Sequence, residues 1–298
     1  MYDIAIVGGG PAALTAAIYA IRYKMNAIVI ASEWGGYMNY AHLVENWPSE
    51  TSITGIELAN KIIEHTKSTK IPMIQANVQA IEKNKKGFVL TTPKEEYEAE
   101  RIILASGTER TKLNIEGESE FLGKGVSYCA TCDGFFFRGK TVAVIGSGDS
   151  ACTSAVYLAD IAKKVYLMYR SDNLKAEPIW IDKVKNNDKV ELLATTMPTK
   201  INGDSVVRSM DCDDNKTREV DGIFVEVGST PSDFLINKLG IKIDKSGYVI
   251  VDPDQKTNVA KVWAAGDITT NSSKFKQMVT AASEGAVAVF NAYIDAKS

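Results

Sequence analysis

The sequence predicts an α/β protein built from two Rossmann-like nucleotide-binding domains. Two observations support this class. At the start of the chain, over residues 4–23, a glycine-rich turn joins a short apolar strand to a helix of small residues. The same series of strand, turn, helix and second strand recurs near the middle of the chain, over residues 141–168.

The first of these units has the residues that a dinucleotide-binding turn requires. Ile4–Val7 is an apolar run typical of a buried parallel strand, and the helix begins at about Pro11. Gly8 permits the tight turn, and Gly10 lets the backbone approach a pyrophosphate. Ala13 stands in the third glycine position and keeps the helix close to the strand. Free amides and the positive end of the helix dipole would then face the phosphates.

The segments that follow are less regular. A strand over 27–30 leads into Ala31 and Ser32, at the positions where an acidic residue usually binds a ribose. Glu33 lies slightly beyond these positions, and the sequence does not decide whether it reaches the ribose. Residues 39–48 fit neither helical nor strand periodicity, so they form either an ordinary loop or a lining for a bound ring system. The other elements expected in this part are a helix over 56–66 and strands near 78–81, 87–92, 97–99 and 102–105.

The second unit repeats the first at one constant offset. Its strand is 141–145, and its turn and helix carry the matching positions: Gly146, Gly148 and Ala151 repeat Gly8, Gly10 and Ala13. A whole unit repeated at constant spacing indicates an internal duplication, and two such units suggest two different nucleotides. The elements expected further along are a strand over 221–228, a hairpin arm over 244–251, a strand over 262–265 and a helix over 276–292.

A pair of cysteines separated by two residues lies within Cys129–Asp133. Two thiols at this spacing can close and reopen a disulfide, as a dithiol catalyst must. A zinc site would need two more ligands, but Cys152 and Cys212 are isolated and His42 and His65 lie far upstream, so a redox pair is favoured over zinc and over a structural disulfide. Cys152 is expected in the core of the second small-residue helix, and Cys212 in an Asp-rich loop with no assigned role.

Composition narrows the class further. The 298 residues are 45% hydrophobic and 24% charged, with a net charge of −3. The chain therefore lacks the excess of positive charge that is typical of a nucleic-acid-binding protein. The longest apolar runs, such as 16–21, are too short to span a bilayer. Met1 leads almost directly into the first strand, without the regions of a signal peptide, and the expected location is the cytoplasm.

Together these motifs resemble those of the low-molecular-weight thioredoxin reductases, over nearly the whole chain. The matching segments are Gly8–Ala13, Val44–Pro48, Ala105–Gly107, Ser127–Asp133, Gly146–Ala151, Ala264–Asp267 and Lys276-Gln277 with Ala281-Ala282. The resemblance implies two three-layer Rossmann-like domains, the second inserted into the first. The FAD-binding domain would comprise 1–111 and 243–298, and the pyridine-nucleotide-binding domain, which carries the redox pair, would comprise 112–242.

The resemblance also implies the residues of a flavin site. Those expected to bind FAD are Gly8, Gly10, Pro11, Ala12, Ala13, Asn46, Gly107, Asp267, Lys276 and Gln277. In the family pattern Asn46 would line the flavin, and Asp267 would bind the ribityl chain. Gln277, at the start of a helix, would face the pyrimidine end of the ring.

For NADPH the resemblance is less complete. The residues expected to bind it are Gly146, Gly148, Asp149, Ser150, Ala151, Arg170, Ser171 and Lys175. The family holds the 2′-phosphate with His-Arg-Arg and a further arginine. Here Arg170 is kept, but Ser171 replaces the second arginine and Lys175 replaces the last. NADPH is the favoured donor, with NADH, ferredoxin or a reduced deazaflavin as alternatives.

The implied activity is that of a thioredoxin-disulfide reductase. Cys132 would be the thiol next to the flavin, Cys129 the thiol that attacks thioredoxin, and Asp133 their acid–base partner. The resemblance further implies a homodimer, and no metal, membrane or nucleic acid is expected. Other hypotheses are a different small dithiol protein as acceptor, a flavin-dependent oxidase or peroxide-system reductase, and a non-catalytic nucleotide-binding redox sensor.

Overall fold

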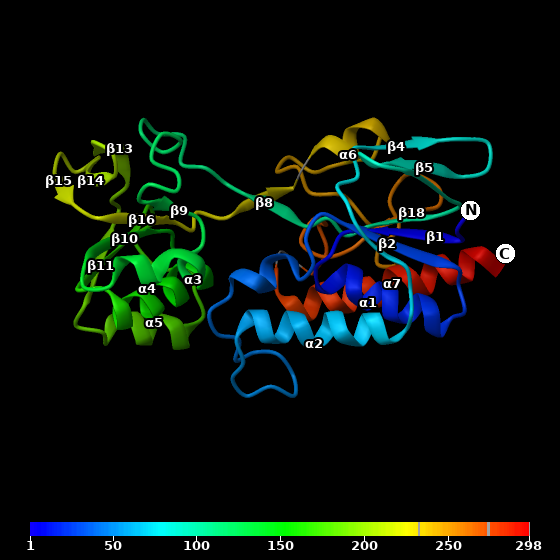
Figure 1. Ribbon diagram of the computed structural model, residues 1–298, viewed down its shortest axis with the longest axis horizontal. Coiled ribbons are helices and arrows are strands. Elements are labelled where there is room, and N and C mark those ends of the chain that lie inside the picture. The colour runs from blue at the N-terminus through cyan, green and yellow to red at the C-terminus, as the bar shows by residue number, and fades with distance from the viewer. Residues whose placement is uncertain (232, 273–274, 298) are drawn as a thin grey trace. The chain divides into compact units, whose positions relative to one another are not determined.

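The computed structural model describes residues 1–231, 233–272 and 275–297 (Figure 1). The chain forms two compact units. Unit 1 comprises Met1–Asn39, Val44–Glu109 and Thr230–Ser298, and unit 2 comprises Tyr40–Leu43 and Arg110–Ser229. The chain re-enters unit 1 at Thr230, earlier than the expected boundary at 243. The physical reason is the helix α6 (Asp233–Lys238), which packs near β4 and buries Ile236 in the unit 1 core.

Unit 1 is built on a five-stranded parallel sheet in the order β18-β7-β1-β2-β3. The strands are β1 (Ile4–Val7), β2 (Ala27–Ala31), β3 (Met73–Gln75), β7 (Ile102–Leu104) and β18 (Val262–Ala264). In this sheet Ile4 pairs with Ala27 and Ala5 with Ile102. Four of the five strands are buried at every residue, because layers cover both faces of the sheet.

Helices cover one face of this sheet and antiparallel strands the other (Figure 1). The helices are α1 (Pro11–Arg22), α2 (Gly55–Ser68) and α7 (Met278–Lys297), and the antiparallel strands are β4 (Ala80–Lys83), β5 (Phe88–Thr91) and β6 (Glu96–Ala99). Alternate residues of β1 point to the two sides, so Ile4 packs among the helices and Ala5 packs with Phe88. A Cβ on Gly285 of α7 would lie 2.1 Å from the carbonyl oxygen of Ala12, so glycine permits the close approach of α7 to α1.

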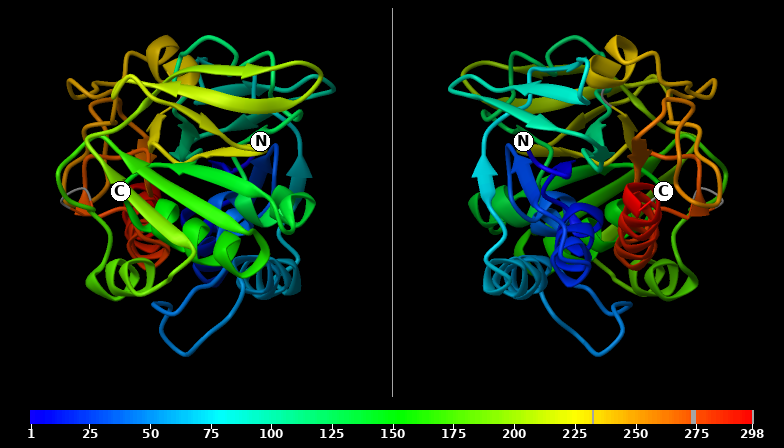
Figure 2. Two further views of the ribbon diagram at one scale, coloured as in Figure 1. Left: turned by 90° about the vertical axis from the view of Figure 1, so that its left-hand side faces the viewer. Right: turned by 90° about the vertical axis from the view of Figure 1, so that its right-hand side faces the viewer.

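Unit 2 repeats this three-layer arrangement. Its parallel sheet has the order β12-β11-β10-β16-β9, with β9 (Val126–Ser127), β10 (Thr141–Ile145), β11 (Lys164–Tyr169), β12 (Val190–Ala194) and β16 (Gly222–Val225). The helices α4 (Asp149–Ile161) and α5 (Pro178–Lys185) lie on one side, and the antiparallel strands β13 (Pro198–Gly203), β14 (Val207–Cys212) and β15 (Thr217–Glu219) lie on the other (Figure 2). The predicted fold class and the predicted duplication are both confirmed.

Two predictions about single cysteines have different outcomes. Cys152 is fully buried in α4, so its assignment to the core is confirmed. The assignment of Cys212 to a loop is wrong, because Cys212 ends β14 and is buried. The residues on either side of Cys212 in the sequence are acidic and face solvent. They obscure the alternation of apolar and polar residues that is typical of a strand in a sheet covered on one face.

The remaining elements join these layers. They are β8 (Thr108–Arg110), β17 (Ser229–Pro231), α3 (Ala130–Asp133) and the 3-10 helices η1 (Gly36–Tyr40) and η2 (Gly134–Phe137). β8 and β17 pair with each other where the chain passes between the units. None of the helices in the described part of the chain has both the length and the apolarity of a bilayer-spanning segment.

Candidate active site

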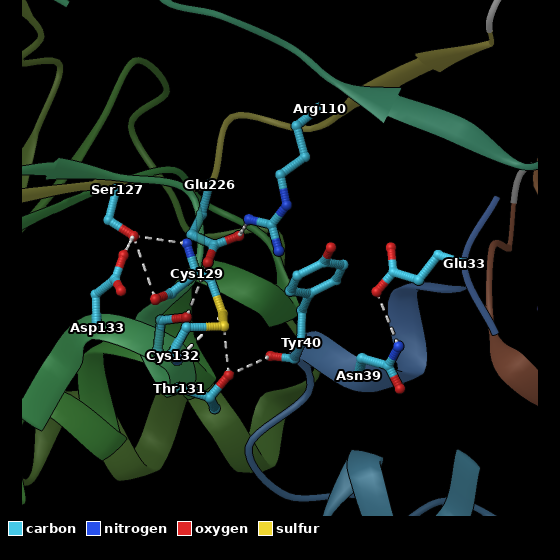
Figure 3. The surroundings of a disulfide bond; sticks show 11 residues. Glu33, Asn39, Tyr40, Arg110, Ser127, Cys129, Thr131, Cys132, Asp133 and Glu226 are labelled. Atoms are coloured by element: carbon cyan, nitrogen blue, oxygen red, sulfur yellow. Dashed lines mark hydrogen bonds and ion pairs between the residues drawn. A yellow bond between two sulfur atoms is a disulfide. The ribbon is translucent and has the colours of Figure 1, made fainter. Parts of the chain in front are cut away.

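The cysteine pair of unit 2 forms a disulfide at the start of α3 (Figure 3). The Cα atoms of Cys129 and Cys132 are 5.3 Å apart. Cys129 is the residue that caps α3, and its Sγ accepts a hydrogen bond of 3.1 Å from the backbone N–H of Cys132. The hydroxyl of Thr131 lies 3.3 Å from the same sulfur. In the described residues, no group of three or more His, Cys, Asp or Glu side chains is placed to hold a metal ion.

Ser127 connects Asp133 to the disulfide. Its hydroxyl donates a hydrogen bond of 2.6 Å to Oδ2 of Asp133 and accepts one of 2.9 Å from the backbone N–H of Cys129 (Figure 3). Ser127 is the last residue of β9, and Asp133 is the last residue of α3, so the turn between the two elements brings them together. No role was predicted for Ser127, because nothing in its spacing distinguishes it from a turn residue.

The two sulfurs differ in their surroundings. Cys132 is exposed, whereas Cys129 is 8% exposed and lines a pocket of about 310 Å³ in unit 2. Asp133 and Ser127 line the same pocket, together with Tyr40, Arg110, Leu122, Gly123, Val126 and Tyr128. The pocket is therefore lined by one cysteine of the disulfide and by the acid that follows the pair.

A partly buried ion pair lies beside this pocket. Nη1 of Arg110 is 3.0 Å from Oε2 of Glu226, and Ser154 donates a hydrogen bond of 3.1 Å to the other carboxylate oxygen. The guanidinium carbon of Arg110 lies 4.8 Å from the ring centre of Tyr40 (Figure 3). Burial raises the pKa of Glu226, and Arg110 and Ser154 oppose that rise. The sequence analysis missed this pair because its members are 116 positions apart.

The two predicted phosphate-binding turns have the same geometry. The backbone N–H of Gly8 donates to Ile30 at 2.9 Å, and that of Gly146 donates to Met168 at 2.9 Å. Both glycines have positive φ, and a Cβ on either would lie within 2.2 Å of a backbone oxygen, that of Ala105 or of Glu226. These two positions require glycine for the turn itself.

The second glycine of each turn has a different reason to be glycine. Gly10 and Gly148 cap α1 and α4 without a side-chain hydrogen bond, and a Cβ on either would meet no atom within 4 Å. Each helix therefore begins at an open space that a phosphate group would fill. The adjoining predicted residues begin these helices, with Pro11, Ala12 and Ala13 in α1 and Asp149, Ser150 and Ala151 in α4. The residues present fit a pyrophosphate at each turn.

Comparison with known proteins agrees with this arrangement. The family model of the pyridine nucleotide-disulphide oxidoreductases matches residues 2–285. A thioredoxin reductase of Bacillus subtilis is 36% identical over 295 residues, which cover 97% of this chain and 92% of that protein. This chain belongs to the thioredoxin reductase family of pyridine nucleotide-disulphide oxidoreductases. The predicted resemblance is confirmed.

Solved structures of this family can be aligned with nearly the whole chain. The thioredoxin reductase of T. acidophilum has a TM-score of 0.94 and 34% identity, with coverage of 100% of this chain and 99% of that one. A ferredoxin-flavin thioredoxin reductase of Clostridium acetobutylicum has a TM-score of 0.55 and 33% identity, with coverage of 99% and 98%. The relative named for ferredoxin is therefore about as similar to this chain in sequence as the thioredoxin reductase of T. acidophilum.

Unit 1 of this family member brings together several residues predicted to bind FAD. Nδ2 of Asn46 donates a hydrogen bond of 3.1 Å to Oε1 of Gln277, although 231 positions separate them. Gly107 follows β7 with a φ of 69° and open space at its Cβ position. Glu33, for which the sequence left a role in ribose binding undecided, is exposed and accepts a hydrogen bond of 3.0 Å from Asn39.

Asp267 and Lys276 form part of a second, partly buried network in unit 1. Burial raises the pKa of Asp267, and the charge of Lys276 opposes this rise. Burial lowers the pKa of Lys276, and the charges of Glu284 and Asp267 oppose this fall. Nζ of Lys276 donates to the carbonyl oxygen of Thr269. Glu284 accepts a hydrogen bond of 2.8 Å from the backbone N–H of Gly266, next to Asp267. Glu284 was not among the residues predicted to bind FAD.

The residues predicted to bind the 2′-phosphate lie in one loop of unit 2, after β11. Arg170 and Lys175 are exposed at its two ends, and the hydroxyl of Ser171 donates a hydrogen bond of 2.7 Å to the carbonyl oxygen of Asn173. The backbone N–H of Lys175 donates to the carbonyl oxygen of Ser147, in the predicted phosphate-binding turn, at 2.7 Å. Asp149 accepts a hydrogen bond of 2.7 Å from the backbone N–H of Glu177, so its carboxylate fixes the start of α5.

Proposed function

We propose that the protein is a thioredoxin-disulfide reductase that uses NADPH as its electron donor. The observation that carries this proposal is the pocket of unit 2, onto which Cys129 of the disulfide and Asp133 both open. FAD, when bound, supplies the two-electron relay between a reduced nicotinamide and the disulfide. The turn at Gly8 and Gly10, together with Asn46 and Gln277, would hold that group in unit 1.

The reduced cysteine pair would act by thiol–disulfide exchange. The Cys129 thiolate attacks one sulfur of the partner's disulfide, forming a bond to that sulfur and breaking the partner's S–S bond. Cys132 then attacks the Cys129 sulfur, which re-forms the Cys129–Cys132 disulfide and releases the second partner sulfur. Two electrons pass to the partner, and the two thiol protons of the pair end on the two partner sulfurs.

Asp133 is proposed to move the protons. Its carboxyl group lines the same pocket as Cys129, so it can take the thiol proton of Cys129 and return it to the leaving sulfur of the partner. Ser127 holds one of its oxygens, Oδ2, at 2.6 Å. This hydrogen bond keeps the carboxyl group on the pocket side of α3.

Two exposed aromatic rings are proposed to receive the partner protein. Phe135 and Phe136 follow Asp133 directly and are 63% and 71% exposed. Leu122, at 51% exposed, lines the pocket. Exposed aromatic side chains next to a reactive group are typical of a protein-binding surface. We propose thioredoxin or a thioredoxin-like protein as the occupant.

The choice of NADPH rests on Arg170 and Lys175. Both are exposed cations beside the phosphate-binding turn, and the hydroxyl of Ser171 lies between them in sequence. The similar identity of the ferredoxin-flavin thioredoxin reductase supports a second candidate, a donor other than a pyridine nucleotide. The open turn at Gly148 favours the nucleotide, because that space has no use in a protein that binds none.

Anaerobic reduction of the flavin-loaded protein tests both candidates. We expect NADPH to bleach the visible flavin band at lower concentration than NADH, and oxidised thioredoxin to restore it. Cys129→Ser and Cys132→Ser should keep the flavin and lose thioredoxin reduction. Indifference to both nucleotides, with bleaching by reduced ferredoxin or a reduced deazaflavin, would overturn the donor. Thioredoxin reduction by Cys132→Ser would overturn the dithiol mechanism.

We also propose that the protein is a homodimer of the cytoplasm. Tyr19, Phe290 and Ile294 are 38%, 46% and 47% exposed on α1 and α7, beside a stacked pair formed by Tyr23 and Tyr293 at 4.7 Å. Such an apolar surface suits contact with a second copy. The free thiols Cys152 and Cys212 suit a reducing compartment. Light scattering of wild type and Phe290→Glu tests the dimer.

A further inference from the structure

We propose that Thr131 is a catalytic residue, whose hydroxyl donates a hydrogen bond to the Cys129 sulfur when that sulfur is a thiolate. This inference rests on the proposed function, in which Cys129 is the attacking thiol. It assigns a role to a residue that lies between the two cysteines and that the mechanism above does not use.

The geometry places the Thr131 hydroxyl at the reacting atom. Its Oγ1 lies 3.3 Å from Sγ of Cys129, and the backbone nitrogen of Cys132 lies 3.1 Å from the same sulfur (Figure 3). A disulfide sulfur has no hydrogen, so the hydroxyl is the one group of this pair that can donate. The branched side chain of threonine restricts χ1, which limits the positions that Oγ1 can occupy.

The same hydroxyl has a second acceptor. Oγ1 of Thr131 lies 3.4 Å from the carbonyl oxygen of Tyr40, in the segment Tyr40–Leu43 of unit 2. A hydroxyl has a single proton, so the two acceptors compete for it. A disulfide sulfur is a weak acceptor, so in the oxidised protein the Thr131 hydroxyl donates to the carbonyl oxygen of Tyr40. A thiolate is a charged acceptor and forms the stronger bond, so reduction turns the proton toward Cys129.

This bond stabilises the thiolate relative to the thiol. The charged and titratable groups around Cys129 are Cys132 and Asp133 of α3, Arg110 with its partner Glu226, and Tyr40, Tyr128 and Glu118. Substitution of Thr131 leaves all of these in place. Loss of a hydrogen bond to a charged group should reduce the thiolate population about tenfold at a pH where the thiol predominates.

Alkylation of reduced, flavin-loaded protein tests the proposal. In a Cys132→Ser background Cys129 is the single redox thiol, and Cys152 and Cys212 are buried. We expect Thr131→Val to slow iodoacetamide alkylation of Cys129 about tenfold at pH 7 and to move the rate profile to higher pH. Thr131→Ser keeps the hydroxyl and should retain the parent profile. Peptide mass spectrometry assigns the alkylated residue.

The outcomes separate this proposal from its alternatives. Equal profiles for Thr131→Val and the parent would overturn it, and so would equal shifts in Thr131→Val and Thr131→Ser, since those indicate packing alone. If melting shows that the valine variant does not fold, Thr131→Ala takes its place. The alkylation rate does not depend on the electron donor or on thioredoxin, so failure here is distinct from failure of the proposed function.

A second readout uses the complete cysteine pair. Without the Thr131 hydroxyl, the reduced form loses stabilisation above the pH at which Cys129 ionises, so the disulfide becomes harder to reduce. A tenfold change in the equilibrium constant corresponds to about 30 mV in this two-electron couple. Equilibration of Thr131→Val and Thr131→Ser with glutathione buffers should give different potentials, with the serine variant matching wild type. Identical potentials for all three proteins would contradict the proposal.

Discussion

At the scale of single residues, Ser127 is the side chain that joins the proposed proton carrier to the disulfide. It donates to Asp133 at 2.6 Å and accepts from the backbone N–H of Cys129 at 2.9 Å. Without this hydrogen bond, the carboxyl group of Asp133 would be free to rotate out of the pocket. Ser127 should therefore matter for turnover and much less for folding.

Ser127→Ala is expected to lower the turnover of thioredoxin about tenfold, a part of the 10²- to 10⁴-fold that a positioned acid or base contributes. Asp133→Asn should cost more, about a hundredfold or above. Ser127→Thr keeps the hydroxyl and serves as the matched control. Flavin reduction by NADPH, measured separately in a rapid-mixing experiment, should be unchanged in Ser127→Ala. Equal turnover in the alanine and threonine variants would argue against the positioning role.

Arg170 carries the prediction about the donor. Arg170→Ala should raise KM for NADPH about tenfold or more, because a charge-assisted hydrogen bond contributes about 1.5–3 kcal/mol. KM for NADH should stay within about twofold, since NADH has no 2′-phosphate. Lys163→Ala, which removes another exposed cation of unit 2, is the control and should change neither constant. A parallel rise in both constants would contradict the assignment.

At the scale of elements, the two strand–turn–helix units use glycine for two separate purposes. Gly8 and Gly146 have positive φ and pack against backbone, whereas Gly10 and Gly148 have ordinary φ and face open space. We assign the first purpose to the fold and propose the second for the ligand. Substitution by alanine should separate them.

Gly10→Ala is expected to fold with a melting temperature near that of the wild-type apoprotein and to bind FAD weakly, because the added methyl group occupies the space before α1. Gly8→Ala should instead destabilise the fold by several kcal/mol, since its Cβ would lie 2.1 Å from the Ala105 oxygen. Flavin content after purification and thermal unfolding of the apoproteins measure the two effects. Retention of full flavin content by Gly10→Ala would count against the site.

In unit 2 the same comparison uses Gly148. Gly148→Ala should retain flavin and folding but weaken the pyridine nucleotide, measured as KM for NADPH. Because the flavin signal is independent of unit 2, this variant separates loss of nucleotide binding from general damage. Loss of flavin from Gly148→Ala would show that the two turns do not act on separate ligands.

At the scale of the whole molecule, four cysteines divide into the disulfide pair beside the pocket of unit 2 and two buried thiols. Burial raises the pKa of Cys152 to about 12, and burial also raises the pKa of Cys212. The buried thiols should stay protonated and unreactive near neutral pH, so the redox pair can be followed without interference.

Thiol counting checks this division. Oxidised native protein should react with no equivalent of a thiol reagent at pH 8, reduced native protein with two, and reduced unfolded protein with four. The folded pKa of Cys152 lies above its ordinary value of 9.0. Stability should therefore fall as pH rises from about 9 toward 12, because the unfolded chain ionises first, and Cys152→Ala should lessen that fall. Reaction of Cys152 in the native protein would contradict its burial.

The sequence alone determined the class of fold, the duplicated turns and the cysteine pair. These follow from periodicity, glycine requirements and spacing, which act over a few neighbouring residues. It did not predict β13–β15, where Cys212 was placed in a loop, because acidic residues on the solvent face obscured the strand pattern. The re-entry of the chain into unit 1 at Thr230 was also missed, since it depends on where α6 packs.

Only the tertiary structure decided which side chains meet. Asn46 reaches Gln277 and Arg110 reaches Glu226 across 231 and 116 positions, and no local pattern encodes such pairs. Ser127, Thr131 and Asp133 are close in sequence, yet the turn from β9 into α3 decides that one binds the carboxyl group and another the sulfur. Residue types determine which chemistry is possible, and packing of distant segments determines which atoms lie within hydrogen-bond distance.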